Sequence, residues 1–178
     1  MKILRTALLS VACASLAVAA AQTGKPASAV PKPEDVASMD SVIHAVYDVI
    51  SGPKGQKRDW DRMRSLFVPG ARLGAAVRLK SGELKAFVFD VEKYIEKSGP
   101  ILEEKGFFER ELHRHVDTFG NMSQAFSTYE SRWKPDDAKP FERGVNSIQL
   151  FNDGKRWWVV SIYWQGEDEK LKLPKKWL

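Results

Sequence analysis

The chain has 178 residues, with 28 Lys and Arg against 23 Asp and Glu, and a single cysteine. This length fits one compact domain with accessory segments, and a hydrophobic fraction of 43% can fill a core, which excludes a wholly disordered or fibrous chain. The charges are of mixed sign without a concentrated basic stripe, so a nucleic-acid partner is not expected.

Residues 1–21 have the pattern of a secretory signal peptide. A basic start precedes an apolar run over residues 6–16, and small residues follow up to a cleavage point after Ala19 or Ala21. The run is shorter than the about 20 residues that span a bilayer. We therefore expect export to the periplasm and no stable membrane anchor after cleavage; the alternative, a lipoprotein anchored at Cys13, would rest on a poor lipobox. The mature chain would lack cysteine, so neither disulfides nor thiol chemistry are expected.

Three helices are predicted in the first half of the chain. Residues 22–33 contain three prolines and indicate an extended spacer. Apolar residues at alternating spacings of three and four then predict a helix over residues 34–51, and a shorter helix follows over residues 60–67. The third begins after Asp90, and we expect Gly99-Pro100 to interrupt it.

Alternating apolar and polar residues predict strands in the rest of the domain. A hairpin is expected from residues 73–79 and 83–89, and four longer strands from residues 107–118, 121–133, 144–151 and 156–165. Because the helices come first and a meander follows, the predicted class is α+β, with three helices packed on a strongly curved antiparallel sheet that forms a cone.

Several short motifs resemble the nuclear transport factor 2-like (NTF2-like) superfamily, which includes SnoaL-like polyketide cyclases, ketosteroid isomerase and scytalone dehydratase. The resemblance covers residues 34–165 and rests on Asp59-Trp60-Asp61 before Leu66-Phe67 and Pro69-Gly70-Ala71, on Phe119-Gly120-Asn121, and on residues 152–158. It implies a domain over residues 34–166, an internal pocket and often a dimer through the outer sheet face, and leaves residues 167–178 as a basic tail. It does not imply one activity, because this fold carries many.

Strand parity predicts which side chains face the pocket. A three-residue loop at 152–154 would set Ile148 opposite Trp158. This register gives an apolar inward face of Asn146, Ile148, Leu150, Trp158, Val160, Ile162 and Trp164. A two-residue turn at 153–154 is less consistent with the apolar pattern.

The preceding hairpin is treated in the same way. A two-residue turn at Phe119-Gly120 places Arg110 and Arg114 inward beside Tyr129, and leaves Glu109, Glu111, His113, His115 and Asp117 on the outside. An inward arginine pair could bind a carboxylate or phosphate on a ligand. The alternative is that both arginines lie at the rim or pair with acids such as Asp48, Asp61 or Glu130.

The candidate ligand-binding residues are Tyr47, Trp60, Arg110, Arg114, Tyr129, Asn146, Trp158 and Trp164. Tyr47 and Asp61 are the candidate catalytic groups, as the nearest counterparts of the general acids and bases that the resembling isomerases and dehydratases use. The alternatives are that Tyr47 is a core tyrosine and Asp61 a surface helix acid. The His113-x-His115 pair lacks further ligands at metal-site spacing, so neither a metal nor a cofactor is expected. Residues 52–57 have the composition of a phosphate loop without its spacing, and a plain loop is expected.

The last predicted strand is apolar on both sides, so its outer face needs a cover. A homodimer, the loop at 134–143 or the tail at 170–178 would each supply one. Three functions remain open: an exported binder of a small hydrophobic molecule, with or without an anionic group, a cofactor-free lyase or isomerase, and an envelope interaction module that uses the outer face around Phe126, Trp157 and Tyr163.

Overall fold

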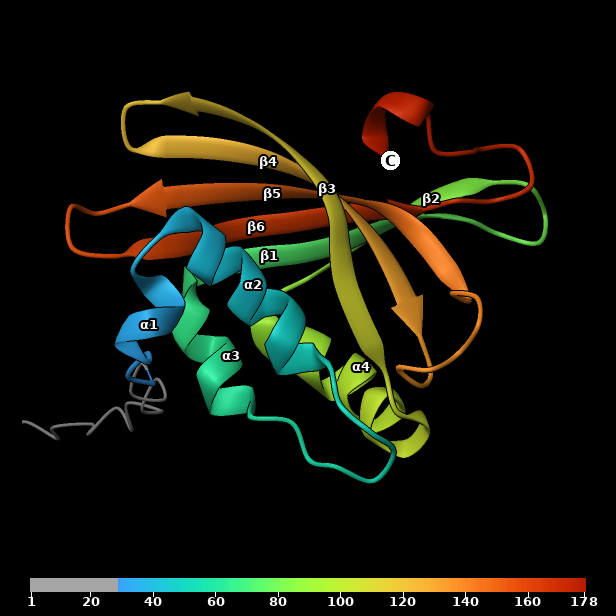
Figure 1. Cartoon of the computed structure of the whole chain (residues 1–178), viewed down its shortest axis with the longest axis horizontal. Helices are drawn as coiled ribbons and strands as arrows, with labels where there is room; N and C mark the ends of the chain where they lie inside the picture. The colour runs from blue at the N-terminus through green and yellow to red at the C-terminus, as the bar shows by residue number, and fades with distance from the viewer. Residues whose placement is uncertain (1–28) are drawn as a thin grey trace, which may run out of the picture.

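The computed structural model describes residues 29–178, so the predicted signal peptide and residues 22–28 of the predicted spacer lie outside the described residues. The elements are α1 (Pro33–Val36), α2 (Met39–Ile50), α3 (Trp60–Leu66), β1 (Phe67–Arg78), β2 (Leu84–Phe89), α4 (Val91–Lys105), β3 (Phe108–Phe119), β4 (Met122–Arg132), β5 (Glu142–Asn152), β6 (Trp157–Gly166) and a 3₁₀ turn, η1 (Lys175–Trp177). Figure 1 shows α1 to α4 gathered on one face of a curved sheet, which confirms the predicted α+β class.

The six strands form one sheet in the order β2-β1-β6-β5-β4-β3. Neighbouring strands are antiparallel with one exception, since β1 and β6 run parallel. The sheet is therefore mixed, whereas the sequence pattern predicted a sheet that is antiparallel throughout. The reason is topological, because the meander from β3 to β6 returns the last strand to the free edge of the first hairpin, a pairing that the order of strands along the chain does not reveal.

The predicted helix over residues 34–51 is two helices. The chain leaves helical geometry at Ser38, whose side-chain oxygen accepts a hydrogen bond from the Ser41 backbone N–H at 3.0 Å and caps α2. Val42, Ile43 and Val46 then point into the core from one side of α2. Capping favours a new helix start at this position over continuation from α1.

Helix α4 passes through Gly99-Pro100, where an interruption was predicted. Gly99 packs directly on α3, because a Cβ at this position would lie 3.1 Å from Cζ2 of Trp60. Leu102, one turn from the glycine, is buried in the core. We attribute the continuous helix to this packing, which offsets the hydrogen bond that the proline ring removes.

Two β-bulges change the predicted pairing of the long strands. Val160 is the extra residue in β6, and Asn152 pairs with Trp157, so the loop before this strand is residues 153–156 and not the predicted 152–154. Both differences together place Ile148 opposite Ile162 and not opposite Trp158. Val159 is consequently buried and Val160 is 38% exposed, the reverse of the predicted inward face. A bulge reverses the alternation of side chains beyond it, and periodicity alone cannot locate it.

The second bulge lies in β3 at Leu112, and the turn that follows this strand is Gly120-Asn121 and not Phe119-Gly120. Arg114 consequently pairs with Ser127, and Arg110 pairs with Glu130. In the part of β3 that precedes the bulge, the alternation of side chains is the reverse of the predicted one. Glu109 and Glu111 therefore face the concave side of the sheet, where Arg110 was expected.

The C-terminal tail lies on the outer face of the sheet, on the side away from the helices (Figure 1). The ring centroids of Trp177 and Phe126 are 5.4 Å apart, and Leu171 and Leu173 line the same hollow as Tyr163. Of the three covers considered for the outer face, which were a homodimer, the loop at 134–143 and the tail, the tail covers part of it. No helix within residues 29–178 combines the length and hydrophobicity needed to cross a membrane.

Candidate functional site

A cavity of about 200 Å³ lies between the helices and the concave face of the sheet. Its apolar walls come from α2, α3, α4 and the central strands; the lining residues are Val46, Ile50, Met63, Leu73, Tyr94, Ser98, Leu102, Phe107, Glu109, Tyr129, Ser131, Phe141, Glu142, Asn146, Ile148, Ile162 and Trp164. Phe141 is 42% exposed and stacks on Trp133, with ring centroids 3.9 Å apart. The cavity therefore has its mouth near the start of β5.

Two carboxyl groups lie on the walls of this cavity. Glu109 of β3 accepts a hydrogen bond from the Ser131 hydroxyl at 2.8 Å. Glu142 of β5 accepts one from the Tyr129 hydroxyl at 2.6 Å. Both acids are held by neutral donors, so neither carboxyl is committed to an arginine or lysine partner in the described part of the chain.

A glycine makes room for one of these contacts. A Cβ added at Gly144 would lie 2.7 Å from the Tyr129 hydroxyl and 2.4 Å from the backbone oxygen of Gln165. A side chain at this position would therefore displace either the strand β6 or the tyrosine that binds Glu142. Gly144 lets the Tyr129 ring reach the cavity wall.

The surroundings of Glu109 raise its pKa from an ordinary value of 4.5 to about 7. Burial is the largest cause, because removal from water disfavours the charged form, and the negative charge of Glu142 acts in the same direction. Hydrogen bonds from Ser131 and Asn146 favour the ionised form and partly oppose the increase. The Glu109 carboxyl can therefore take up and release a proton near neutral pH.

A chain of hydrogen bonds connects the cavity to the surface. Asn146 donates to the Tyr47 hydroxyl at 3.0 Å, and Tyr47 shares a 2.6 Å hydrogen bond with Ser127. Ser127 donates in turn to Glu111, which is held by Arg114. Burial raises the pKa of Tyr47, so this hydroxyl stays neutral and acts as a positioning group.

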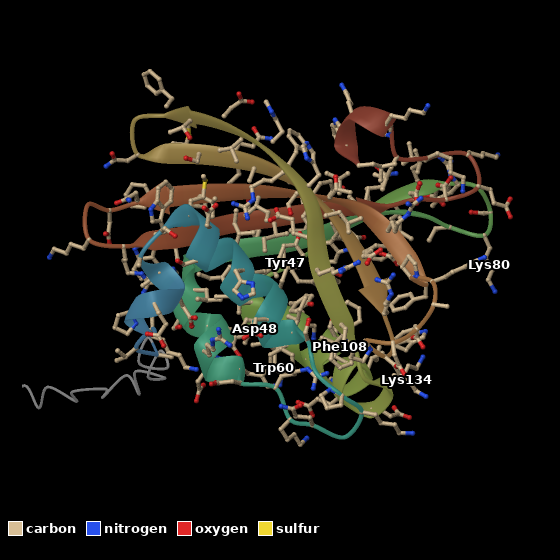
Figure 2. The ribbon with its side chains drawn as sticks, viewed as in Figure 1. Tyr47, Asp48, Trp60, Lys80, Phe108 and Lys134 are labelled. Atoms are coloured by element: carbon tan, nitrogen blue, oxygen red, sulfur yellow. The ribbon has the colours of Figure 1, made fainter. Side chains whose placement is uncertain are left out.

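A wider groove of about 620 Å³ lies on the other side of Glu109 and Tyr47. Figure 2 shows its flanks, with Tyr47 and Asp48 on α2 and Phe108 at the start of β3. Within the groove, Glu130 accepts hydrogen bonds from both Arg110 and Arg132. Glu109 therefore separates an apolar interior from a polar exterior.

Four of the predicted binding residues meet at the cavity. Tyr129, Asn146 and Trp164 line it, and Tyr47 reaches it through its hydrogen bond with Asn146. The Trp164 ring meets Tyr94 edge to face, with centroids 6.2 Å apart. Tyr129, Asn146 and Trp164 come from the concave face of the sheet, which agrees with the parity argument, whereas Tyr47 comes from α2.

The inward placement of Arg110 and of Trp158 was wrong. The Arg110 side chain is 69% exposed and binds Glu130 at 2.6 Å. Trp158 lies outside the core, with its indole N–H bound to Asp153 at 2.8 Å and the Arg156 guanidinium over its ring. Arg110 lies beyond the bulge at Leu112 from the turn on which its predicted direction was based. Trp158 follows a loop of residues 153–156, one residue longer than the loop on which its direction was based.

Three further predicted residues lie outside the cavity. Arg114 faces the helices but is neutralised by Glu111 and Asp40. Trp60 packs against α4 and donates its indole N–H to Glu103 at 3.1 Å. Asp61 is an exposed helix acid that pairs with Arg64, the surface alternative that the sequence left open.

Sequence reasoning missed Glu109, Glu142 and Tyr94 as cavity residues. Glu109 was assigned to the outside because the bulge at Leu112 has no signature in the pattern, and Glu142 was assigned to a loop. Only Tyr94 carried a usable signal, since it lies on the apolar side of a predicted helix. The two cavity acids could therefore not be identified without the observed pairing of the strands.

The histidine pair lies on the exposed side of β3, where His115 contacts Asp117 at 3.2 Å. No group of three or more His, Cys, Asp or Glu within residues 29–178 is arranged to hold a metal ion. The segment over residues 52–57 is a loop, as predicted, and it is held by the buried Arg58, which donates to the backbone oxygens of Gly52 and Leu102.

Comparison with known proteins gives a fold and no closer relationship. No protein-family model matches the chain, and no curated protein matches it. Among solved structures, a protein of unknown function with a cystatin-like fold from Nostoc punctiforme is similar, with a TM-score of 0.54 and 8% identity over 76% of this chain and 92% of that chain.

Two further solved structures carry the NTF2-like description. A proposed dehydratase from Streptomyces avermitilis has a TM-score of 0.54 and 12% identity, over 75% of this chain and 96% of its own. An NTF2-like protein of unknown function from Silicibacter pomeroyi has a TM-score of 0.50 and 15% identity, over 74% of this chain and 94% of its own. The chain has the NTF2-like fold, as the sequence resemblance implied.

Proposed function

We propose that this protein binds a small molecule in the interior cavity and that Glu109 transfers a proton to or from it. The observation that carries the proposal is the Glu109 carboxyl group on an apolar cavity wall, hydrogen-bonded only to neutral groups, with a pKa of about 7. A general acid or base is most effective when its pKa lies near the working pH.

The rest of the cavity supports this chemistry. Apolar side chains such as Ile148 and Ile162 exclude water, which strengthens electrostatic interactions inside. The Tyr129 hydroxyl and the Asn146 amide lie on the same walls and can orient a bound carbonyl or hydroxyl group. One similar solved structure is a proposed dehydratase, and loss of water from a carbon skeleton requires the removal of a proton from carbon. The likeness is of fold, so the support for a base comes from Glu109 itself.

The positions of the charged residues change which ligand we propose. The earlier expectation of an anionic ligand rested on an inward arginine pair, but Arg110 binds Glu130 outside the cavity and Arg114 is paired with acids. A carboxylate at Glu109 would repel an anion. We therefore keep a small, largely apolar ligand and replace the anionic group with a neutral or positive one. Export to the periplasm stays part of the proposal, on the sequence of residues 1–21.

A Kemp elimination tests the base directly. In this reaction a carboxylate removes the C3 proton of 5-nitrobenzisoxazole and the ring N–O bond breaks. The ring-opened product is a coloured cyanophenolate. The purified protein should accelerate the reaction, and the rate should rise with pH through about 7 as Glu109 ionises. Glu109→Gln should abolish the acceleration. Asp61→Asn, which removes an exposed carboxylate, should leave it unchanged. Equal rates for wild type and Glu109→Gln would refute the assignment.

A further inference from the structure

The charge of the interior cavity is negative. Glu109 and Glu142 lie on its walls, whereas no lysine, arginine or histidine occurs among the lining residues given above for the described chain. Burial raises the pKa values of Tyr94 and Tyr129, which keeps both phenols neutral. Nothing on the walls therefore balances the carboxylates when both are ionised.

Aromatic rings make up a large part of the same walls. Tyr94 and Trp164 meet edge to face, and Phe107 and Phe141 do the same nearer the mouth, with centroids 6.1 Å apart. The face of an aromatic ring is negative and attracts a cation, most strongly where water is excluded. Rings and carboxylates thus favour the same kind of ligand.

The size of the cavity limits that ligand further. Pockets for drug-sized molecules have volumes of about 300–1,000 Å³. The interior cavity, at about 200 Å³, is smaller, and Met63, Ile148 and Ile162 close its inner part. The charged group must therefore be compact and carry apolar substituents.

We propose that the cavity takes a small organic cation, a compact alkylammonium whose positive group lies between Glu109 and Glu142 and whose alkyl groups contact the aromatic walls. This inference rests on the proposed binding function and names the class of ligand. The mouth at Phe141 and Glu142 gives the ammonium group its way in, because Glu142 is exposed at the rim and Glu109 lies further inside.

The proposal implies a pH dependence of binding. A cation should bind more tightly as Glu109 ionises, so affinity should rise through about pH 7. On the cavity side, the titratable groups that face Glu109 are Glu142 from β5, Tyr94 from α4 and Tyr129 from β4. On the groove side they are Tyr47, His44 and Asp48 from α2, Arg110 and Glu111 from β3, Glu130 and Arg132 from β4, and Asp136 and Asp137 from the following loop. The three phenols have raised pKa values and stay protonated in this range. Among the described residues of the groove only Glu109 also lines the cavity, so its ionisation governs binding there.

The experiment compares choline with 3,3-dimethylbutan-1-ol, which has the same shape with carbon in place of the charged nitrogen. Binding to the full chain is measured by isothermal titration calorimetry above pH 7. Choline should bind about tenfold or more tightly than the alcohol. Glu109→Gln should remove most of that preference, and Asp61→Asn should leave it intact, since Asp61 is exposed on α3 and lies outside the cavity.

The outcomes separate this inference from the proposed function. Equal binding of choline and the alcohol would overturn the cation inference and leave the cavity as a binding site. No binding of either probe, together with Glu109-dependent turnover of 5-nitrobenzisoxazole, would overturn the cation inference alone. No binding and no Glu109-dependent turnover would overturn both.

Discussion

Replacing Glu109 with glutamine should change how the stability of the fold depends on pH. The carboxyl lies on the wall of an apolar cavity, and its ionised form is disfavoured there by burial and by the charge of Glu142. Glutamine has a similar volume, and its amide oxygen can still accept the hydrogen bond from Ser131. The substitution therefore removes the charge and little else.

The magnitude follows from the two pKa values. The pKa is 4.5 for an ordinary glutamate and about 7 for Glu109 in the folded chain, and each factor of ten in the dissociation constant is worth about 1.4 kcal/mol. Below pH 4.5 the group is neutral in both states, so it contributes no pH dependence. Between 4.5 and 7 the unfolded chain loses its proton first and stability falls. Above 7 the full penalty of about 3 kcal/mol is present.

The assay is chemical denaturation of the wild type and of Glu109→Gln at a series of pH values from about 4 to about 8.5. The other carboxyl groups titrate in both proteins, so the difference between the two free energies of unfolding isolates Glu109. That difference should shift by about 3 kcal/mol in favour of the variant as pH rises. Asp61→Asn serves as control and should run parallel to the wild type, because Asp61 is exposed. Parallel curves for wild type and Glu109→Gln would refute the placement of an ionisable carboxyl in this cavity.

Three other predictions test the scaffold. Arg58→Met should lower the unfolding free energy by about 2–4 kcal/mol in urea denaturation, because it removes the hydrogen bonds of a buried guanidinium to the backbone oxygens of Ile50, Gly52 and Leu102, whereas the exposed Arg72→Met should change it by less than about 0.5 kcal/mol. Gly144→Ala should cost about 1–3 kcal/mol in the same assay, since its methyl group would clash with the Tyr129 hydroxyl; an unchanged midpoint would contradict the close approach. Ending the chain after Gly166 should uncover the outer sheet face and increase self-association in sedimentation velocity, and an unchanged sedimentation coefficient distribution would show that the tail does not shield that face.

The sequence by itself determined the class, the order of the elements and most of their bounds. Amphipathic spacing identified the buried side of α2, and alternation identified the four long strands to within a few residues. These features are local, because the side-chain direction along a helix or strand follows from backbone geometry. The short motifs also implied the NTF2-like fold, and Tyr129, Asn146 and Trp164 were correctly placed on the concave face.

The tertiary structure decided what the cavity contains. A bulge at Leu112 turned Glu109 inward and Arg110 outward, and a longer loop before β6, followed by a bulge at Val160, placed Val159 inward and Trp158 outward. Neither bulge leaves a mark in the apolar pattern, because it inserts one residue whose position depends on the partner strand. One such residue reverses the direction of every side chain beyond it. In β3 the bulge places an acid, and not an arginine, on the cavity wall, and this reverses the charge expected of the ligand. The parallel pairing of β1 with β6 and the tail on the outer face likewise depend on contacts between segments far apart in the sequence, which local periodicity does not encode.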